Sequence, residues 1–437
     1  MFLNLPTLLR HMVSIYFETL GCSINVSETE SMKGLLAKYD FKIVEAPEDA
    51  FVIVVNICTV KGDNTALKTI RKLYEEFPDR KYIVAGCITK TIIQDIKKII
   101  PEPSFISTHN IKEIVSVVEE TINDNPISVI ERSSDEKIGL PRIRKNPIIG
   151  IVPISSGCLG CCTYCSVRLI KGKLRSYSIQ NITDEIKKDV QEGCKEIWLT
   201  SQDTGSYGKD IGTNLVNLLD EIVKIEGNFM IRVGMMNPNH ALEMLDDLIK
   251  IYKNKKIFKF LHIPVQTGNN DILKLMKRDY GVEDFIKIVD GFRRNFERIT
   301  IATDIIVGFP GETKEQLNDS VKLIEKTTPD VVNIARFNPR PGTEAAEIKQ
   351  TLTGDELKDR TRLITQIFEW TAHNLNNKWI KWEGKVLIDA EGKEETSVGR
   401  NFAYKPIIVE GIYPVGTELN VKIIDSTKHY LIGEKIN

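Results

Sequence analysis

The most constraining feature of the sequence is a run of cysteines in the middle of the chain. Four of the eight cysteines fall within positions 158–165. Cys158, Cys162 and Cys165 have the spacing C-x-x-x-C-x-x-C, which puts three thiolates on one short segment. Three thiolates leave one corner of a 4Fe-4S cube without a protein ligand. The spacing therefore predicts an iron-sulfur cluster whose open iron can bind a substrate or a cofactor.

Three other uses of such a cysteine run fit less well. A structural zinc site needs a fourth Cys or His at finger-like spacing, and Cys161 stands too close to Cys162 for both to bind one ion comfortably. Disulfide frameworks belong to small secreted proteins, whereas residues 1–10 of this long chain carry one basic residue and no small-residue cleavage site, so no signal peptide is expected. A ferredoxin-type carrier normally closes its cluster with four cysteines.

Length, charge and hydrophobicity limit the class of protein. A chain of 437 residues with 42% hydrophobic and 27% charged side chains predicts a soluble protein of roughly three domains. Its formal net charge of -1 argues against binding nucleic acid by global charge alone. No apolar run approaches the ~20 residues that cross a bilayer, so no membrane partner is expected. Eight reduced cysteines favour the cytoplasm, and we expect a monomer.

The first third of the chain alternates strand-like and helix-like segments. Strands are predicted at 14–19, 51–55 and 82–85, and helices at 27–39, 66–77 and 91–99. This alternation predicts a parallel sheet with right-handed crossovers. The predicted N-terminal α/β domain spans residues 12–125, and residues 126–146 form a linker with one predicted strand at 127–130.

A cysteine follows each of these three strands. Because the carboxyl ends of parallel strands share one edge of a sheet, Cys22, Cys58 and Cys87 should converge there. A buried cysteine is often only a small packing residue, but three cysteines in the same structural position favour a second cluster with three protein ligands. Candidate hydrogen-bonding residues at the same edge are Asn25, Asn56 and Thr59.

The cysteine run lies in a segment without acidic residues. Residues 137–183 contain no Asp or Glu, although about six would be expected at the average composition of the chain. The basic residues of this segment are Lys137, Arg142, Arg144, Lys145, Arg168, Lys171, Lys173 and Arg175. Such a positive field can hold phosphates or a carboxylate, or it can balance the negative charge of thiolate-ligated clusters. Arg142, Arg144 and Lys145 are the candidate RNA contacts.

The strand and helix alternation resumes in a central domain, residues 147–375. Strands are predicted at 148–154, 196–200, 230–233, 258–265, 299–307 and 331–336, with helices between them. This pattern favours a partial (βα)6 barrel, in which active-site residues lie on the loops after the strands. The candidate cofactor-binding residues on or after these strands are Gln202, Asp203, Asn237, Gln266, Asp304 and Gly308. We interpret His262 and Cys194 as packing residues.

In the C-terminal tail, the spacing of apolar residues changes from that of helices to that of short strands. After a helix predicted at 354–379, residues 376–437 contain five short predicted strands, which favour a small all-β barrel of a shape often used for RNA. The tail has nine Lys and Arg against nine Asp and Glu, so its charge does not establish nucleic-acid binding. Arg400 and Lys405 are further candidate RNA contacts. They lie beside Phe402 and Tyr404, a composition typical of a base-stacking surface or equally of a core.

Together these motifs resemble a known enzyme family. The C-x-x-x-C-x-x-C run after the first strand of a βα barrel looks like the radical S-adenosylmethionine superfamily. The upstream motifs Leu20-Gly21-Cys22-x-x-Asn25, Asn56-x-Cys58-Thr59 and Gly86-Cys87, with a tail similar to the TRAM RNA-binding domain, make the chain resemble the methylthiotransferases. Residues 202–208, 232–238 and 302–312 look most like the archaeal and eukaryotic branch, which acts on threonylcarbamoyladenosine beside the tRNA anticodon.

The resemblance implies a chemistry for both cysteine groups. Cys158, Cys162 and Cys165 would hold a 4Fe-4S cluster whose open iron binds S-adenosylmethionine, which is cleaved to a 5'-deoxyadenosyl radical. Cys22, Cys58 and Cys87 would hold a second, auxiliary 4Fe-4S cluster that carries the sulfur. The implied partners are tRNA and a reducing electron donor, and the implied product carries a methylthio group at C2 of the adenine.

Two departures and several alternative functions stand beside this reading. At the position of Cys161 the family commonly has a residue other than cysteine, so Cys161 either takes no part in the cluster or competes with Cys162 for iron. The residues before Met12 have no counterpart in the motif pattern of the family. Alternative substrates are isopentenyladenosine in tRNA and an aspartate of a ribosomal protein. The alternative class is a non-catalytic iron-sulfur protein that binds RNA or carries electrons, but such a carrier gains nothing from two open irons.

Overall fold

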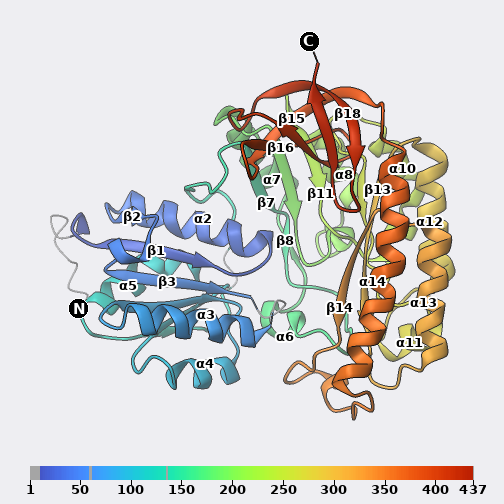
Figure 1. Ribbon diagram of the computed structural model, residues 1–437. Coiled ribbons are helices and arrows are strands. Elements are labelled where there is room, and N and C mark those ends of the chain that lie inside the picture. Colours follow the sequence, from blue (N-terminus) through green and yellow to red (C-terminus); the bar gives the residue numbers. More distant parts are fainter. Residues whose placement is uncertain (1–9, 59–61, 134–135, 437) are drawn as a thin grey trace. The chain divides into compact units, whose positions relative to one another are not determined.

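The computed structural model describes residues 10–58, 62–133 and 136–436. The chain forms two compact units, which are described separately below (Figure 1). The first unit contains residues 1–145, 151–158 and 166–185, and the second contains residues 146–150, 159–165 and 186–437. The cysteine run is therefore divided between the two units, with Cys158 in the first and Cys162 and Cys165 in the second.

A parallel sheet forms the centre of the first unit. Its strands are β1 (Ser14–Thr19), β2 (Lys42–Val44), β3 (Val52–Ile57), β4 (Lys81–Gly86), β5 (Ser104–Ser107) and β6 (Ser128–Val129). In the described residues the strand order is β2-β1-β3-β4-β5-β6, and every pairing is parallel. The predicted parallel sheet is confirmed, including the strand in the linker.

Helices cover both faces of this sheet. They are α2 (Ser23–Lys38), α3 (Asp63–Glu76), α4 (Lys90–Lys97) and α5 (Ile114–Ile122). Figure 1 shows α2 on one side of the sheet and α3 and α4 on the other. The side chains of β3 alternate between two apolar cores, since Val52 and Val54 pack in one and Ile53 and Val55 in the other. Each such buried side chain contributes roughly 1.5–3 kcal/mol, which explains why β3 is a continuous apolar run.

The sequence pattern missed β2, β5 and α5. The two strands have three and four residues, too few to show a period, and a short apolar segment such as α5 does not distinguish a helix from a buried strand.

Residues from the cysteine-run region complete the first unit. They form α6 (Val167–Lys171) and a small antiparallel pair, β8 (Ser155–Ser156) with β9 (Arg175–Ser176). The Oγ of Ser27 donates to the backbone oxygen of Ile151 at 3.2 Å. Arg142 pairs with Glu185, in the middle of α7 (Ile179–Gln191), at 2.9 Å, and both side chains are 2% exposed.

The second unit contains the predicted βα architecture. Its strands are β7 (Ile149–Pro153), which begins in this unit, β10 (Glu196–Thr200), β11 (Met230–Val233), β12 (Phe260–His262), β13 (Thr300–Val307) and β14 (Val331–Arg336). In the described residues they form two sheets, β11-β10-β7 and β12-β13-β14. A parallel bridge between Ile231 and Ile257 and a hydrogen bond from Met236 N to His262 O at 3.0 Å link the sheets. The predicted partial (βα)6 barrel is confirmed.

Helices alternate with these strands. They are α8 (Leu215–Ile222), α9 (Pro238–Glu243), α10 (Leu245–Tyr252), α11 (Asn270–Leu275), α12 (Val282–Asn295), α13 (Lys314–Thr327) and α14 (Gly354–Asn377). Thr313 and Thr353 begin α13 and α14 with capping boxes, in which each threonine accepts a backbone N–H from the residue three positions later. The strand predicted at 258–265 is shorter than expected and spans Phe260–His262. Pro264, just beyond its end, has no N–H to donate to a ladder.

The tail forms the predicted small barrel. The strands β15 (Glu383–Glu391), β16 (Thr396–Arg400), β17 (Pro406–Glu410), β18 (Glu418–Ser426) and β19 (Leu431–Lys435) close in the order β15-β16-β17-β19-β18. Alternate residues of these strands, such as Val386, Ile388 and Val421, fill the interior. None of the described helices is both long and apolar enough to span a membrane.

Candidate functional site

Three cysteines meet at the carboxyl edge of the first unit's sheet. Cys22, Cys58 and Cys87 follow β1, β3 and β4, which are neighbouring parallel strands. The thiol of Cys58 hydrogen-bonds with both Cys22 and Cys87. Cys58 and Cys87 are buried, whereas Cys22 is exposed at the N-cap of α2. Topology thus brings together three thiols that are distant in sequence.

Two glycines allow this close approach. Gly21 and Gly86 both have positive φ, at 151° and 101°. A Cβ on Gly21 would lie 2.7 Å from the Cβ of Cys58, and one on Gly86 would lie 2.3 Å from the Oδ1 of Asn56. Any side chain at either position would therefore push the cysteine turns apart.

Two buried asparagines brace the same turns. The Nδ2 of Asn25 donates to the Oδ1 of Asn56 at 3.2 Å and to the backbone oxygen of Ile57 at 3.0 Å. In return, the Nδ2 of Asn56 donates to the backbone oxygen of Asn25 and to the Oγ1 of Thr29, both at 2.9 Å. The predicted hydrogen-bonding role of Asn25 and Asn56 at this edge is confirmed. Thr59 lies outside the described residues.

A buried group of charges accompanies the three cysteines. The Oε1 of Glu28 lies 2.6 Å from the Nζ of Lys137 and 3.1 Å from the Nζ of Lys171. Both ammonium groups also donate to the Oγ1 of Thr108, at 3.2 Å and 2.5 Å. Burial alone would raise the pKa of Glu28, but the two ammonium groups hold that pKa at about 2. Two of the basic residues in the acid-free segment are thus buried.

Neighbouring groups lower the pKa of two of the three thiols. Hydrogen bonding with Cys58 lowers the pKa of Cys22 to about 6 and that of Cys87 to about 7. The positive charge of Lys171 lowers the pKa of both thiols further. A lowered pKa favours the thiolate, which is the form that binds metal.

The chemistry of this donor set suits an iron-sulfur cube. A 4Fe-4S cube takes its thiolates on separate irons. Three converging thiols, two of them with a lowered pKa, in a cradle that a Cβ would fill are therefore suited to such a cube.

The cysteine run itself is anchored in both units. In the first unit, the backbone N of Cys158 donates to Gly172 O at 3.2 Å. In the second unit, Cys162 and Cys165 form a tight turn, closed by a hydrogen bond from Cys165 N to Cys162 O at 3.1 Å. Thr163 fixes this turn by donating from its N to Met276 O at 3.2 Å. Cys161 is exposed.

Arg278 contacts the cysteine turn, and the sequence analysis missed it. Its Nη1 donates to the Sγ of Cys162 at 2.9 Å, and its Nη2 donates to the Oδ1 of Asn237. Its Nε donates to the hydroxyl of Tyr280 at 3.0 Å, and the guanidinium lies 4.9 Å from the centre of that ring. Arg278 is one of 59 Lys and Arg residues, and no sequence signal distinguishes it.

Asp203 and Asn237, both predicted to bind the cofactor, continue this network. The Oδ1 of Asp203 accepts from the backbone N of Gly205 and of Asn237, both at 3.0 Å. Its Oδ2 accepts from the Nδ2 of Asn237 at 2.6 Å. A cavity of about 70 Å³ beside them is lined by residues that include Cys162, Asn237, His240 and Arg278. The loops after β10 and β11 are thus joined to Cys162.

Three other predicted cofactor residues also lie at strand ends of the second unit. The Oε1 of Gln202, after β10, is buried and has no hydrogen-bond partner among the described residues. Gln266 has φ of 72° and bridges to β13 through Asp304 O at 2.8 Å. Gly308 has φ of 74° and donates to the Oε2 of Glu312 at 2.9 Å.

Asp304 pairs with His262 inside the barrel strands. The Nε2 of His262 lies 3.0 Å from the Oδ1 of Asp304, which also accepts from the Nδ2 of Asn333 at 2.6 Å. Burial opposes ionisation of Asp304, but the hydrogen bond and charge of His262 outweigh it and lower the pKa. His262 is therefore a paired side chain, as the packing interpretation expected.

Two of the predicted RNA contacts are buried in ion pairs, and a third is paired but partly exposed. Arg142 is buried against Glu185. Lys405 is buried, with its Nζ 2.7 Å from the Oδ1 of Asp330 and 2.8 Å from the Oδ1 of Asn376. Arg400 donates from its Nε to the Oδ2 of Asp389 at 3.0 Å. Arg142 and Lys405 cannot reach a phosphate from these positions, whereas Lys145 is exposed.

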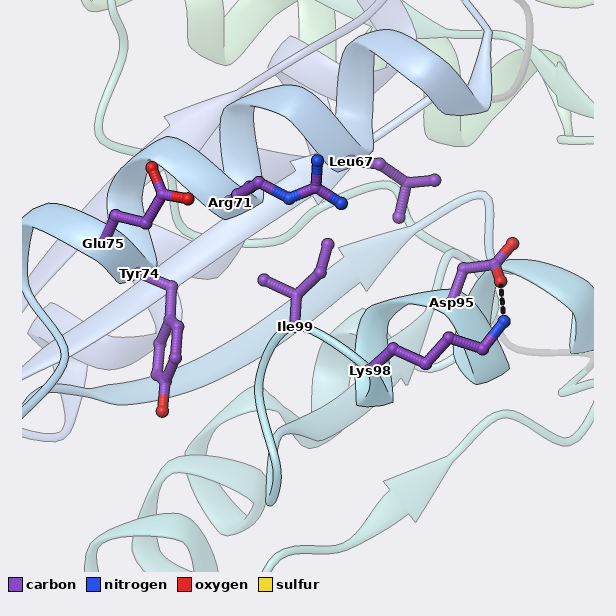
Figure 2. Close-up of a pocket in the computed structure, with 7 residues that line it drawn as sticks. All are labelled: Leu67, Arg71, Tyr74, Glu75, Asp95, Lys98 and Ile99. Carbon is purple, nitrogen blue, oxygen red and sulfur yellow. Dashed lines mark hydrogen bonds and ion pairs between the residues drawn. The ribbon is translucent and has the colours of Figure 1, made fainter.

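The described residues contain a larger pocket away from the cysteines. It has a volume of about 380 Å³ and lies between α3 and α4, as Figure 2 shows. Its lining residues are Leu67, Arg71, Tyr74, Glu75, Asp95, Lys98 and Ile99. Asp95 and Lys98 pair with each other at 2.7 Å. The pocket holds no residue that the sequence analysis had singled out.

Comparison with protein families matches three parts of the chain. The radical SAM superfamily matches residues 152–324. The family described as uncharacterized protein family UPF0004 matches residues 14–107, and the TRAM domain matches residues 383–436. These matches coincide with the central strands, the N-terminal sheet and the C-terminal barrel.

Similar proteins cover nearly the whole chain. A Pyrococcus horikoshii protein named probable threonylcarbamoyladenosine tRNA methylthiotransferase is 44% identical over 430 residues, which is 97% of this chain and 100% of that protein. The human threonylcarbamoyladenosine tRNA methylthiotransferase is 38% identical over 97% of this chain and 74% of that protein. Among solved structures, the radical S-adenosylmethionine methyltransferase TsrM of Kitasatospora setae has a TM-score of 0.56 at 13% identity, covering 76% of this chain and 75% of that chain. That last likeness shows the fold alone.

Proposed function

Because the chain belongs to the threonylcarbamoyladenosine tRNA methylthiotransferase family, we propose that it inserts a methylthio group at C2 of N6-threonylcarbamoyladenosine next to the tRNA anticodon. The observation that carries the proposal is the presence of two separate three-cysteine groups, one at the edge of a parallel sheet and one on the cysteine run. Each group leaves one iron of a 4Fe-4S cube open.

The two groups have different roles in the proposal. Cys158, Cys162 and Cys165 would hold the cluster that binds S-adenosylmethionine, and Cys22, Cys58 and Cys87 would hold the auxiliary cluster. When bound, the clusters supply the electron that cleaves S-adenosylmethionine and the sulfur that is transferred. The reducing equivalents come from an external electron donor, and the cytoplasm, where thiols stay reduced, is the proposed compartment.

The side chains around Cys162 prepare that site. Arg278 stabilises the thiolate of Cys162 by a charge-assisted hydrogen bond. Asn237 orients Arg278, and Asp203 in turn fixes Asn237 through both its amide groups. The buried Oε1 of Gln202 is an unused acceptor at the neighbouring strand end, suited to a donor on the cofactor.

Binding of tRNA is proposed for the C-terminal barrel and for the linker. The match to the TRAM domain supports the barrel, and the exposed Lys145 with its neighbour Arg144 supports the linker. Arg142 and Lys405 are left out because the structure buries them in ion pairs. Arg400, whose side chain is 26% exposed, stays in the proposal as a contact on the barrel.

The cluster assignment is tested by anaerobic reconstitution. We expect about eight irons per chain, four for each cube. Cys162→Ala should abolish 5'-deoxyadenosine formation, and Cys161→Ala, which removes the neighbouring thiol, should not. Cys58→Ala should still form 5'-deoxyadenosine but no methylthio product. Continued cleavage of S-adenosylmethionine by the Cys162→Ala protein would show that the first cluster is assigned wrongly.

The substrate is tested by mass spectrometry of tRNA nucleosides from cells with and without the gene. The methylthio derivative of threonylcarbamoyladenosine should disappear when the gene is removed and return when it is restored. An unchanged peak contradicts the proposed substrate. Loss of the methylthio derivative of isopentenyladenosine instead would identify that alternative.

A further inference from the structure

Two buried ammonium groups of the first unit share a single carboxylate. Lys137 and Lys171 are each about nine-tenths or more buried, and the ion pairs that the described residues give them are both with the Oε1 of Glu28. One carboxylate therefore serves two ammonium groups. A buried ion costs several kcal/mol unless an opposite charge compensates it, so a further negative charge is expected nearby.

Contacts on several elements hold Lys171 at the edge of the sheet where the three cysteines meet. Thr108, which accepts from Lys171 Nζ at 2.5 Å, donates its backbone N to Gly86 O at 2.8 Å, and Gly86 directly precedes Cys87. Glu28 lies on α2, the helix that starts after Cys22.

The short helix that carries Lys171 is itself fixed. The Nε2 of His109 lies 2.8 Å from Ile170 O, and the Nη2 of Arg132 donates to Leu169 O at 2.8 Å. These contacts fix the backbone that carries Lys171.

Thiolate ligands at this edge of the sheet would supply the compensating charge that Glu28 alone does not. Three thiolates on a 4Fe-4S cube in its 2+ state give a net charge of about -1, and one-electron reduction makes it more negative.

We propose that Lys171 is the buried counter-charge of the auxiliary cluster and raises its reduction potential, with Glu28 and Thr108 holding the ammonium group in position. A nearby buried cation stabilises the reduced, more negative cluster more than the oxidised one. The inference rests on the proposed ligation by Cys22, Cys58 and Cys87. Lys171 is a positioning residue in this scheme, since it acts through the cluster.

The test uses the full chain with Cys158, Cys162 and Cys165 replaced by Ala, so that only the auxiliary cluster is present. Its potential is measured by dithionite titration followed by electron paramagnetic resonance. Lys171→Met should make the midpoint potential more negative at unchanged iron content. Lys171→Arg, which keeps the charge, should keep the potential near that of the parent, and Lys173→Met, which removes an exposed cation two residues away, should not change it.

Stability separates this role from a merely structural one. Lys171→Met leaves Lys137 and Glu28 as a balanced pair, so the cluster-free protein should melt no lower than its parent. An unchanged potential at full iron content, or a lower melting temperature with loss of iron, overturns the inference. Failure of the wild-type chain to hold more than about four irons contradicts the auxiliary cluster itself, and with it the proposed function.

Discussion

The Nη1 of Arg278 lies 2.9 Å from the Sγ of Cys162. Through the same guanidinium, Cys162 is connected to Asn237 after β11, and Asn237 is bound to Asp203 after β10. One cation thus joins the cysteine turn to two strand ends of the barrel. Changes in Arg278 should therefore alter the chemistry at Cys162 more than the stability of the fold.

Arg278→Met should slow cleavage of S-adenosylmethionine. The variant loses a hydrogen bond from a charged group, worth about 1.5–3 kcal/mol, which corresponds to a decrease of roughly 10- to 150-fold in rate. The measurement is the rate of 5'-deoxyadenosine formation per cluster. Lys277→Met, which removes the exposed neighbouring cation, is the matched control. An unchanged rate in the Arg278 variant contradicts the role given to this residue.

Asp203→Asn should destabilise the second unit. The carboxylate accepts three hydrogen bonds. In the Asn variant, an NH2 group takes the place of one carboxylate oxygen and faces N–H groups that can only donate. We expect a loss of about 1–3 kcal/mol, seen as a melting temperature lower by roughly 2–4 °C for each kcal/mol. Asp220→Asn on the exposed face of α8 should have little effect. Equal melting temperatures for the two variants count against the network.

Lys405→Met should lower stability without changing how tRNA binding depends on salt. The substitution leaves the buried Asp330 without its closest cation, at a cost of about 3–5 kcal/mol. Lys145→Met is the opposite case, because this exposed residue is a proposed phosphate contact. Its loss should reduce the slope of log affinity against log salt by about one. If the slope of log affinity against log salt changes in the Lys405→Met protein, at a temperature where it is folded, Lys405 does contact RNA.

Glu196→Gln should change the pH dependence of stability. Burial raises the pKa of Glu196 to about 7, with a smaller contribution from the negative charge of Asp389. Below about pH 4.5 the carboxyl is protonated in both the folded and the unfolded chain, so it does not affect their balance. Between that pH and about 7 the unfolded chain ionises while the folded chain keeps its proton, so stability falls as pH rises.

The Gln variant removes this fall. Its free energy of unfolding should exceed that of the wild type at pH 8 by up to ~3 kcal/mol and should differ little at pH 4. Urea unfolding of the cluster-free chain at the two pH values measures the difference. Glu221→Gln at an exposed position of α8 serves as the control. A wild-type stability that does not fall between pH 4.5 and 7 contradicts the raised pKa.

The sequence by itself determined the order of the elements and where the cysteines lie on them. Buried parallel strands must be continuous apolar runs because both of their faces are covered, as β3 is. Once the strands are placed, the topology of a parallel sheet requires Cys22, Cys58 and Cys87 to share one edge. The spacing of Cys158, Cys162 and Cys165 is likewise local and can be read without a structure.

Only the tertiary structure decided which basic side chains form buried ion pairs and which remain exposed. Lys171, Lys137, Arg142 and Lys405 are buried and paired, whereas Lys145 is exposed, although nothing in the sequence distinguishes these five basic residues. Arg278 reaches a cysteine 116 positions away. The partner of a charge depends on which distant segments pack around it, and neither periodicity nor spacing along the chain contains that information.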